Sequence, residues 1–289
     1  MNIVFSVFID IPEAKLDNPG YYIDNILVDT DKSLKTKNAL LNNADELKRR
    51  HKEYADSIGA EYILFEYSKE YEKFCKLFTA ISQYDIVNFY KHLLMYELSY
   101  KYDNVCYFDF DVVPNTTESI FDAFDMNKFA VAHSNERAEW GKNAPASKYN
   151  TCIRNPASKY WNTYAMLFEE DHEPDNDVFN TGIMAASSKV IQEFDYFKDF
   201  DRIIELMTKL KYDEDSDFPP NIQRIFNYDN ETVFSYLVQT QQTEIDWLTK
   251  DWHWIVDVPD KKMIDHRAKL YHVIDKQFEL VLGKYIVYE

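Results

Sequence analysis

The stretch NVCYFDFDVV at residues 104–113 is apolar nearly throughout, yet it carries two aspartates, Asp109 and Asp111. A short apolar run rich in β-branched and aromatic residues, closed here by Pro114, predicts a buried strand. Side chains of a strand alternate between its two faces, so positions two apart share a face. The sequence therefore predicts both carboxylates on one face, near the carboxyl end of this strand.

Two carboxylates on one face of a buried strand repel each other and lose their hydration. A divalent cation removes this penalty, because Mg²⁺ and Mn²⁺ take carboxylate oxygens as ligands. Ligands of open α/β sheets also gather beyond the carboxyl ends of the strands. The alternative is a solvent-facing strand end whose carboxylates cap the next helix. The apolar neighbours Tyr107, Phe108 and Phe110 favour a metal site.

Strand-like and helix-like segments alternate on both sides of this stretch. Upstream, we expect strands at residues 2–9 and 61–66 and helices at residues 33–57 and 80–102, with Gly59 as a helix stop. Downstream, we expect strands at residues 129–133, 180–186 and 270–274, helices at residues 187–197, 200–210 and 230–240, and a C-terminal helix. The expected fold class is therefore α/β, with a Rossmann-like, mostly parallel central sheet flanked by helices in one continuous domain.

The composition limits what this chain binds. Its net charge of −18 argues against a protein that coats nucleic acid or an anionic membrane non-specifically. With only 5 glycines among 289 residues, it has neither a Walker loop nor a Rossmann fingerprint. If the chain binds a nucleotide, it must therefore hold the diphosphate by something other than a glycine-rich loop.

The three cysteines, Cys75, Cys106 and Cys152, are widely spaced and form neither a disulfide framework nor a zinc pattern. That usage suits a reducing compartment. The N-terminal run lacks the basic flank and cleavage site of a signal peptide, and no segment approaches the run of about 18 apolar residues that a membrane span needs. We expect a cytoplasmic protein.

Residues 105–113, VCYFDFDVV, resemble the hydrophobic-strand DxD motif of glycosyltransferases with the GT-A fold, and the order of other landmarks is similar to the family 8 type. The further landmarks, in chain order, are a first strand ending in Asp10, the aromatic–aromatic–basic element Phe89-Tyr90-Lys91, the strand FNTGIM at residues 179–184, the run Asp229-Asn230-Glu231, and Tyr271-His272 near the C-terminus. Two departures stand out. Lys91 replaces the usual Arg, which turns a bidentate contact into a point-charge contact. After His272, the family's HxxGxxKPW pattern is not reproduced, because Asp275 takes the Gly position and Lys276 comes early.

The resemblance implies a metal-dependent transfer of a sugar from a nucleotide sugar to a hydroxyl acceptor. The donor it implies is a UDP-sugar. Residues 1–113 would form the nucleotide-binding half of the single domain, and residues 114–289 the acceptor-binding half. The implied ligands of Mn²⁺ or Mg²⁺ are Asp109, Asp111 and His272. The implied donor-binding residues are Asp10, Lys91, Asp109, Asn180, Gly182 and Lys276, and the implied catalytic residues are Asp229 and Glu231, one of which would orient the acceptor hydroxyl or act as general base.

Each of these roles has a structural alternative. His272 could be a core histidine with satisfied hydrogen bonds, and Lys91 could lie on a solvated helix face. Asp10 could be a turn residue before a proline, and Asp229 could simply cap the following helix. The strand at residues 179–184 could carry only a bulge at its glycine.

Residues 137–161 form a basic, aromatic segment within this acidic chain. Arg137, Lys142, Lys148, Arg154 and Lys159 face a single acid, Glu139, with Trp140, Tyr149, Tyr160 and Trp161 interleaved. This mixture suits a nucleic-acid acceptor with a splayed base, or a sugar acceptor that stacks on aromatic faces. The overall acidity slightly favours a glycan over a hydroxymethylated DNA base of the kind that some phage transferases modify. The alternative is a surface loop that offsets local acidity.

Two other classes compete with a glycosyltransferase. A haloacid-dehalogenase phosphatase also carries a DxD after an apolar strand, but it would have a downstream Gly-Asp or Asp-Asp pair, and neither dipeptide follows Asp111. A non-catalytic sugar- or nucleotide-binding module is the non-enzyme alternative. The presence of both DxD carboxylates favours an enzyme.

Overall fold

The computed structural model describes residues 1–16, 21–23, 26–28, 31–78, 81–136, 138, 156–212, 223, 226–256 and 264–282. Its largest element is a six-stranded sheet with the order β4-β1-β5-β8-β7-β9. These strands are β1 (Asn2–Val7), β4 (Glu61–Phe65), β5 (Asn104–Asp109), β7 (Phe129–His133), β8 (Phe179–Ser187) and β9 (Ile245–Trp247). β1 is parallel to β4 and β5, and β9 is parallel to β7, whereas β8 is antiparallel to both β5 and β7.

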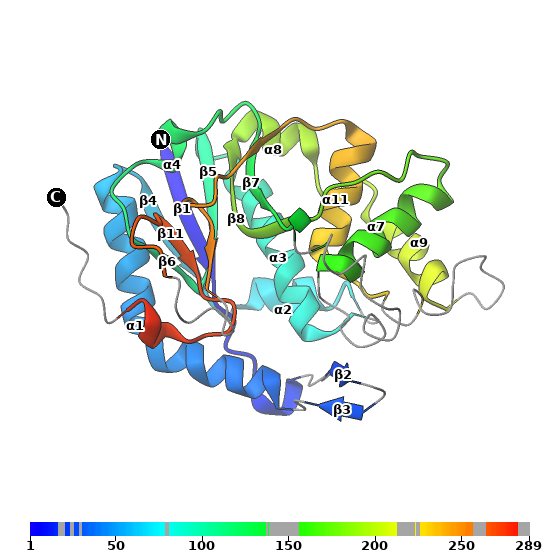
Figure 1. Ribbon diagram of the computed structural model, residues 1–289, viewed down its shortest axis with the longest axis horizontal. Coiled ribbons are helices and arrows are strands. Elements are labelled where there is room, and N and C mark those ends of the chain that lie inside the picture. Colours follow the sequence, from blue (N-terminus) through cyan, green and yellow to red (C-terminus); the bar gives the residue numbers. More distant parts are fainter. Residues whose placement is uncertain are drawn as a thin grey trace.

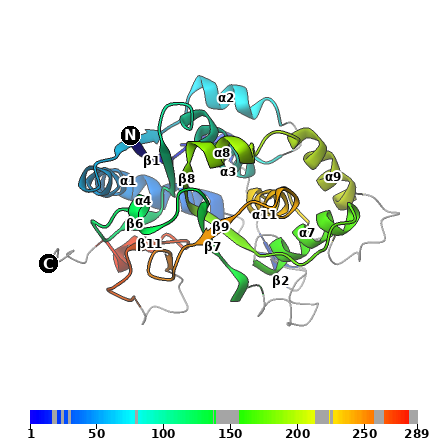
Figure 2. The same ribbon diagram turned by 90° about the horizontal axis from the view of Figure 1, so that it is seen from above.

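Helices and a smaller sheet cover the two faces of this sheet (Figure 1). The helical segments are η1 (Glu13–Lys15), α1 (Lys32–Ser57), α2 (Lys69–Cys75), α3 (Gln83–Leu98), α4 (Ile120–Ala123), α7 (Pro156–Glu169), α8 (Ser188–Phe194), α9 (Phe200–Tyr212), α11 (Asn230–Gln241) and η3 (Phe278–Leu280). The smaller sheet has the order β10 (Trp254–Ile255), β11 (Leu270–His272) and β6 (Val112–Pro114), and a hairpin joins β2 (Tyr21–Ile23) to β3 (Ile26–Val28). Seen from above, α2, α3 and α8 lie on one side of the sheet, and β6 and β11 lie on the other (Figure 2). The predicted α/β class, with a mostly parallel central sheet between helices, is confirmed.

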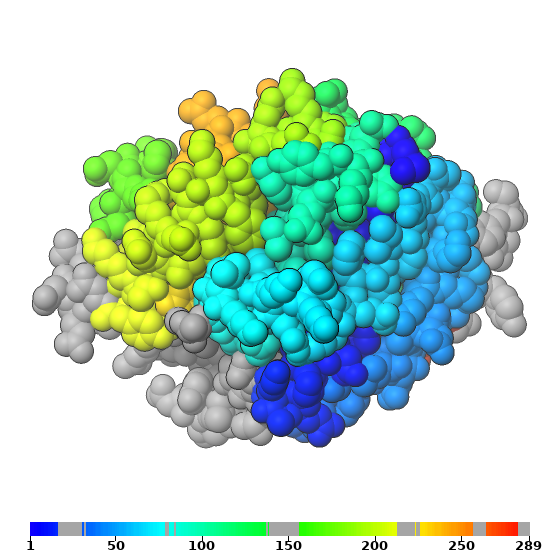
Figure 3. Space-filling view, turned by 180° about the vertical axis from the view of Figure 1, so that it is seen from behind, coloured from blue at the N-terminus to red at the C-terminus, as the bar shows by residue number. Residues whose placement is uncertain are grey.

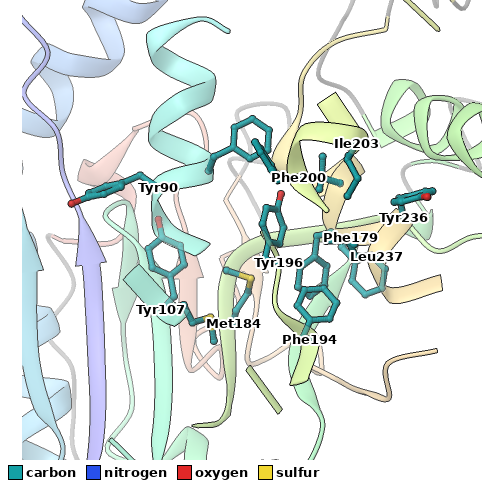
Figure 4. Packing of buried hydrophobic residues seen from close by; sticks show 14 of the residues in the cluster. Tyr90, Tyr107, Phe179, Met184, Phe194, Tyr196, Phe200, Ile203, Tyr236 and Leu237 are labelled. Atoms are coloured by element: carbon teal, nitrogen blue, oxygen red, sulfur yellow. The ribbon is translucent and has the colours of Figure 1, made fainter. Parts of the chain in front are cut away.

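Side-chain alternation along β5 divides the core between the two faces. Val105 and Tyr107 join the cluster that α3, α8, α9 and α11 cover, whereas Cys106 and Phe108 join a cluster on the opposite face. Figure 4 shows the first cluster from close by, with Tyr107 among its aromatic members. By the same alternation, Asp109 at the end of β5 lies on the α3 side. This is why Lys91 of α3 lies 3.5 Å from its carboxylate.

α1 ends where the sequence predicts, whereas α3 spans Gln83–Leu98 and is shorter at both ends than the helix expected over residues 80–102. Gly59 has a φ of +67°, and the N–H groups of Gly59 and Ala60 donate to the carbonyls of Asp56 and Ala55. This pair of bonds is the Schellman arrangement, which satisfies the last carbonyls of α1 and needs a residue that tolerates a left-handed backbone. At the start of α3, the Ser82 hydroxyl accepts the N–H of Asp85 at 3.1 Å. From behind, α1, α2 and α9 lie across one face of the molecule (Figure 3).

The prediction of one strand over residues 104–113 was wrong in its last third. β5 ends at Asp109, Phe110 and Asp111 form a turn, and β6 pairs with β11 in the smaller sheet. Phe110 leaves the line of β5 because it joins a third cluster beneath α1, where its ring stacks on Phe8 with 4.8 Å between centroids. The two aspartates therefore do not share one face of one strand.

The predicted C-terminal helix was also wrong within the described residues. After β11 the chain makes one 3-10 turn, η3, and residues 283–289 lie outside the described part of the chain. None of the helices in the described ranges combines the length and the apolar character needed to cross a bilayer.

A candidate metal centre at the end of the central strands

Asp109, Asp111 and His272 meet where β5, the turn after it and β11 converge. One ligand atom from each residue lies within 4.8 Å of the other two. His272 Nε2 is 3.5 Å from Asp109 Oδ2 and 3.5 Å from Asp111 Oδ1. Asp111 and His272 are buried, and Asp109 is about one quarter exposed at its side chain, 26%. The predicted set of two carboxylates and one imidazole is thus brought together, although by a turn rather than by strand alternation.

The other oxygen of each carboxylate is held by the protein. Asp109 Oδ1 accepts the Tyr107 hydroxyl at 2.5 Å and lies 3.5 Å from the Lys91 ammonium. Asp111 Oδ2 forms an ion pair with Lys276. One oxygen of each aspartate therefore remains turned toward His272 Nε2.

The charges around Asp111 keep it ionised. Burial raises the pKa of this carboxyl group, but the nearby Lys276 and His272 outweigh burial, so the pKa lies well below its usual range. Burial also raises the pKa of the Tyr107 phenol, and here nothing offsets it: Asp109 raises that pKa further, well above its ordinary value. Tyr107 thus stays a hydrogen-bond donor to Asp109.

This donor set fits a divalent cation of the Mn²⁺ or Mg²⁺ kind. Carboxylate oxygens and imidazole nitrogen are ligands that manganese accepts, and carboxylates suit magnesium. The 3.5 Å separations are longer than an ordinary hydrogen bond, so His272 engages the two carboxylates only loosely. Side chains around the site already orient both carboxylates: Tyr107 donates a hydrogen bond to Asp109, and Lys276 forms an ion pair with Asp111.

Gly182 makes room for the histidine ring. A Cβ at this position would lie 2.3 Å from Cε1 and 2.7 Å from Nδ1 of His272, which is closer than side chains approach. Asn180 contacts the same glycine, because its side-chain Oδ1 accepts a hydrogen bond from the Gly182 N–H at 3.0 Å. The predicted donor residues Asn180 and Gly182 therefore lie beside the candidate metal ligand.

A bulge in β8 explains the position of Thr181. The pairing with β7 passes from Met184 to Asn180 between two consecutive β7 residues, so residues 181–183 are not in register with β7. The freed backbone of Thr181 is used on two sides: its carbonyl accepts Lys91 Nζ at 2.9 Å, and its N–H donates to Glu231 Oε1 at 2.8 Å. The bulge that the sequence left as an alternative is present, and it carries both contacts.

The second acidic cluster lies at the start of α11. Asp229 Oδ1 accepts the N–H groups of Glu231 and Thr232 at 2.9 and 3.0 Å, so Asp229 is the N-cap of this helix. Glu231 is buried, accepts from Thr181, and forms an ion pair with Lys159 of α7. Asn230 Oδ1 lies 3.1 Å from His92 Nε2. The two predicted catalytic carboxylates are adjacent but have different surroundings.

The remaining predicted residues lie at the edges of the site. Asp10, which follows β1, is half exposed and pairs with Lys37 at 2.8 Å. Lys91 is buried, with 2% of its side chain exposed, and is not on a solvated helix face. Of the basic, aromatic segment, residues 137 and 139–155 lie outside the described chain, whereas Lys159, Tyr160 and Trp161 lie on α7.

Two histidines of the site were missed by the sequence reading. His253 Nε2 lies 2.9 Å from His272 Nδ1. His51 of α1 donates from Nε2 to the Val112 carbonyl at 2.5 Å and contacts Ser6 Oγ at 2.9 Å. Burial lowers the pKa of His51 to about 4, against weaker opposing effects of the Val112 carbonyl and Asp111. No local pattern marks either residue, because both partners are distant in sequence.

Comparisons with known proteins give structural similarity to solved glycosyltransferases. A glycosyltransferase involved in the glycosylation of the major capsid of PBCV-1 matches with a TM-score of 0.43 and 13% identity, over 96% of this chain and 98% of that one. The galactosyltransferase LgtC, in complex with donor and acceptor sugar analogs, matches with a TM-score of 0.46 and 11% identity, over 95% of this chain and 87% of that one. Mouse xyloside xylosyltransferase 1 matches with a TM-score of 0.45 and 10% identity, over 95% and 98%. No protein-family model matches the sequence, and no curated protein matches it. Chains this dissimilar in sequence can differ in what they bind, so the residues of the site itself carry the functional proposal.

Proposed function

We propose that this chain is a metal-dependent glycosyltransferase that moves a sugar from a nucleotide sugar, expected to be a UDP-sugar, to a hydroxyl acceptor. The observation that carries the proposal is the convergence of Asp109, Asp111 and His272, with one oxygen of each carboxylate turned toward the imidazole nitrogen. Asp109, Asp111 and His272 would hold Mn²⁺ or Mg²⁺. When bound, such an ion supplies a Lewis acid that neutralises the charge of a diphosphate leaving group.

Residues around that ion are proposed to bind different parts of the donor. Lys276, at the edge of the site beside Asp111, is proposed to contact the donor diphosphate. Lys91 Nζ contacts the Thr181 carbonyl and lies near Asp109 Oδ1, so its contacts favour a role in positioning the Asp109 carboxylate. Gly182 and Asn180 are proposed to line the donor sugar, and Asp10, beyond β1, to lie beside the base. In this proposal, charged side chains hold the diphosphate in place of a glycine-rich loop, which the sequence lacks.

The acceptor side is proposed to lie at the starts of α7 and α11. Glu231 and Lys159 form a buried, charged pair there, with Tyr160 and Trp161 next along α7. Within this proposal Glu231 orients the acceptor hydroxyl, and Asp229 contributes by capping the helix that carries Glu231. Aromatic faces beside polar groups suit a sugar ring, and the net charge of −18 favours a glycan over DNA as the acceptor.

Thermal unfolding with nucleoside diphosphates tests the donor site. A ligand at a hundred times its dissociation constant stabilises the native state by about 2.7 kcal/mol, which raises the melting temperature by several degrees. We expect Mn²⁺-dependent stabilisation by one nucleotide in the wild type and in Asp56→Asn, an exposed control on α1. Asp111→Asn should lose that stabilisation and lower turnover by about a hundredfold or more, since even outer residues of metal sites are worth about 10–100-fold.

Other outcomes lead to the competing classes. Nucleotide binding that needs neither metal nor Asp111, without transfer or donor hydrolysis, would indicate a binding module. Absence of stabilisation by every nucleotide, with release of phosphate from phosphate monoesters, would indicate a phosphatase. Either result would contradict the proposed function.

A further inference from the structure

His253 faces the ring nitrogen of His272 that points away from the two aspartates. Its Nε2 lies 2.9 Å from His272 Nδ1, and both residues are buried, with 7% and 4% of their surface exposed. The smaller sheet sets this approach. Trp254 and Ile255 of β10 pair with Tyr271 and His272 of β11, so continuing this register places His253 opposite Leu270, on the same face as His272 and diagonal to it.

The direction of this hydrogen bond follows from the position of the carboxylates. His272 turns Nε2 toward Asp109 Oδ2 and Asp111 Oδ1. A neutral imidazole that binds a cation through Nε2 must carry its proton on Nδ1. Nδ1–H then donates to His253, so His253 Nε2 must be the acceptor and its own proton must be on Nδ1. Two buried rings 2.9 Å apart thus select one tautomer each.

Gly182 restrains the same ring at another edge. Its missing Cβ leaves the space in which Cε1 and Nδ1 of His272 lie. With contact at Gly182 and a hydrogen bond at His253, the imidazole has little freedom to rotate about its Cβ–Cγ bond. A ring held in this way needs less ordering when a cation binds.

We propose that His253 is a positioning residue that fixes the tautomer and orientation of His272 for a divalent cation at Asp109, Asp111 and His272. This inference rests on the proposed function, because it assumes that these three residues bind a metal ion. His253 itself does not touch the cation, so its effect is on affinity for the ion and on the step that needs it. The Gln side chain can place its Oε1 acceptor near the position of His Nε2, whereas Leu cannot accept a hydrogen bond.

Mn²⁺ titration followed by electron paramagnetic resonance tests the inference without any activity measurement. We expect His253→Leu to weaken Mn²⁺ binding about 10–100-fold and His253→Gln to stay within about threefold of the wild type. Melting temperatures without metal, measured for all three proteins, report whether each is folded. A His253→Leu protein that is folded and binds Mn²⁺ as tightly as the wild type would overturn the inference, and so would a His253→Gln protein as weak as His253→Leu. Failure of the wild type to bind Mn²⁺ would instead overturn the proposed function.

A second measurement decides the matter if His253→Leu does not fold. Long-range ¹H–¹⁵N correlation spectra of ¹⁵N-histidine-labelled wild type with Mg²⁺ report the tautomer of each ring. We expect the proton on Nδ1 in both His272 and His253, with assignment from His253→Gln. A proton on Nε2 of His253 would show that it donates to His272 and would overturn the inference.

Discussion

The two acidic clusters of the site use buried carboxylates in different ways. At the proposed metal side, Asp109 and Asp111 each have one oxygen held by the protein and one turned toward His272. At the proposed acceptor side, Glu231 has one oxygen on the Thr181 N–H and the other on Lys159, and Asp229 caps α11. The first cluster leaves one oxygen of each aspartate facing only an imidazole, although Lys276 pairs with Asp111, whereas both oxygens of Glu231 are held by groups of the chain. The groups that already contact the carboxylate oxygens therefore distinguish the two kinds of acidic residue in this site.

The largest expected effect is at Glu231, because both of its oxygens are held within the chain. Lys159→Met leaves the buried Glu231 carboxylate without its ion-pair partner, which should lower the free energy of unfolding by about 3–5 kcal/mol. Urea denaturation measures this change. Lys189→Met, which removes an exposed lysine paired with Glu193, should change it by no more than about 0.5 kcal/mol. A loss below 1 kcal/mol in Lys159→Met would mean that Glu231 does not depend on Lys159, and the contrast between the clusters would fail.

The next effect concerns the metal side and is smaller in stability. Gly182→Ala places a methyl group against the His272 ring, which should cost about 1–3 kcal/mol and weaken Mn²⁺ binding about 10–100-fold. Chemical denaturation and Mn²⁺ titration measure the two effects. Gly59→Ala is the matched control: its left-handed backbone disfavours alanine, yet nothing lies within 4 Å of the added carbon. Unchanged Mn²⁺ affinity in Gly182→Ala, beside a stability loss like that of Gly59→Ala, would show that the His272 ring does not need this space.

The smallest effect separates a cap from a catalytic group. Asp229→Ala removes the acceptor for two N–H groups and should lower the free energy of unfolding by about 1 kcal/mol, whereas Asp229→Asn retains the cap and should stay within a few tenths. Turnover of Asp229→Asn is the decisive measurement. We expect a change of about threefold or less, because a capping role tolerates the amide. A loss of tenfold or more without loss of stability would place Asp229 in contact with the acceptor.

Much of the fold followed from periodicity and from caps. The alternation of β5 placed its side chains on two faces, and Gly59 ended α1 because only a residue tolerant of positive φ fits there. The break after Asp109 did not follow. Phe110 would be buried whether β5 continued or turned, and an apolar run does not indicate which of two clusters a side chain will join. Tertiary packing decided it, through the Phe8 ring and the bond from His51 to the Val112 carbonyl.

The site was predictable where residue type and local spacing carried the signal. Asp109 and Asp111 stood out because acids are rare in apolar runs, and His272 came from the resemblance rather than from any property of its neighbours. The pairings of Lys159 with Glu231 and of His253 with His272 were not predictable. They join positions 72 and 19 residues apart, and only the register of strands and helices brings them together.

The bulge of β8 has a consequence for how the two sides can change independently. Thr181 offers its carbonyl to Lys91, which supports Asp109, and its N–H to Glu231, so one residue's backbone angles set both contacts. A displacement of Glu231 must either break its bond to Thr181 or rotate that backbone and pull on the Lys91 contact. Substitutions around Glu231, the proposed acceptor residue, would therefore also alter the geometry of Asp109, a proposed cation ligand, because the contacts of both depend on the backbone of Thr181.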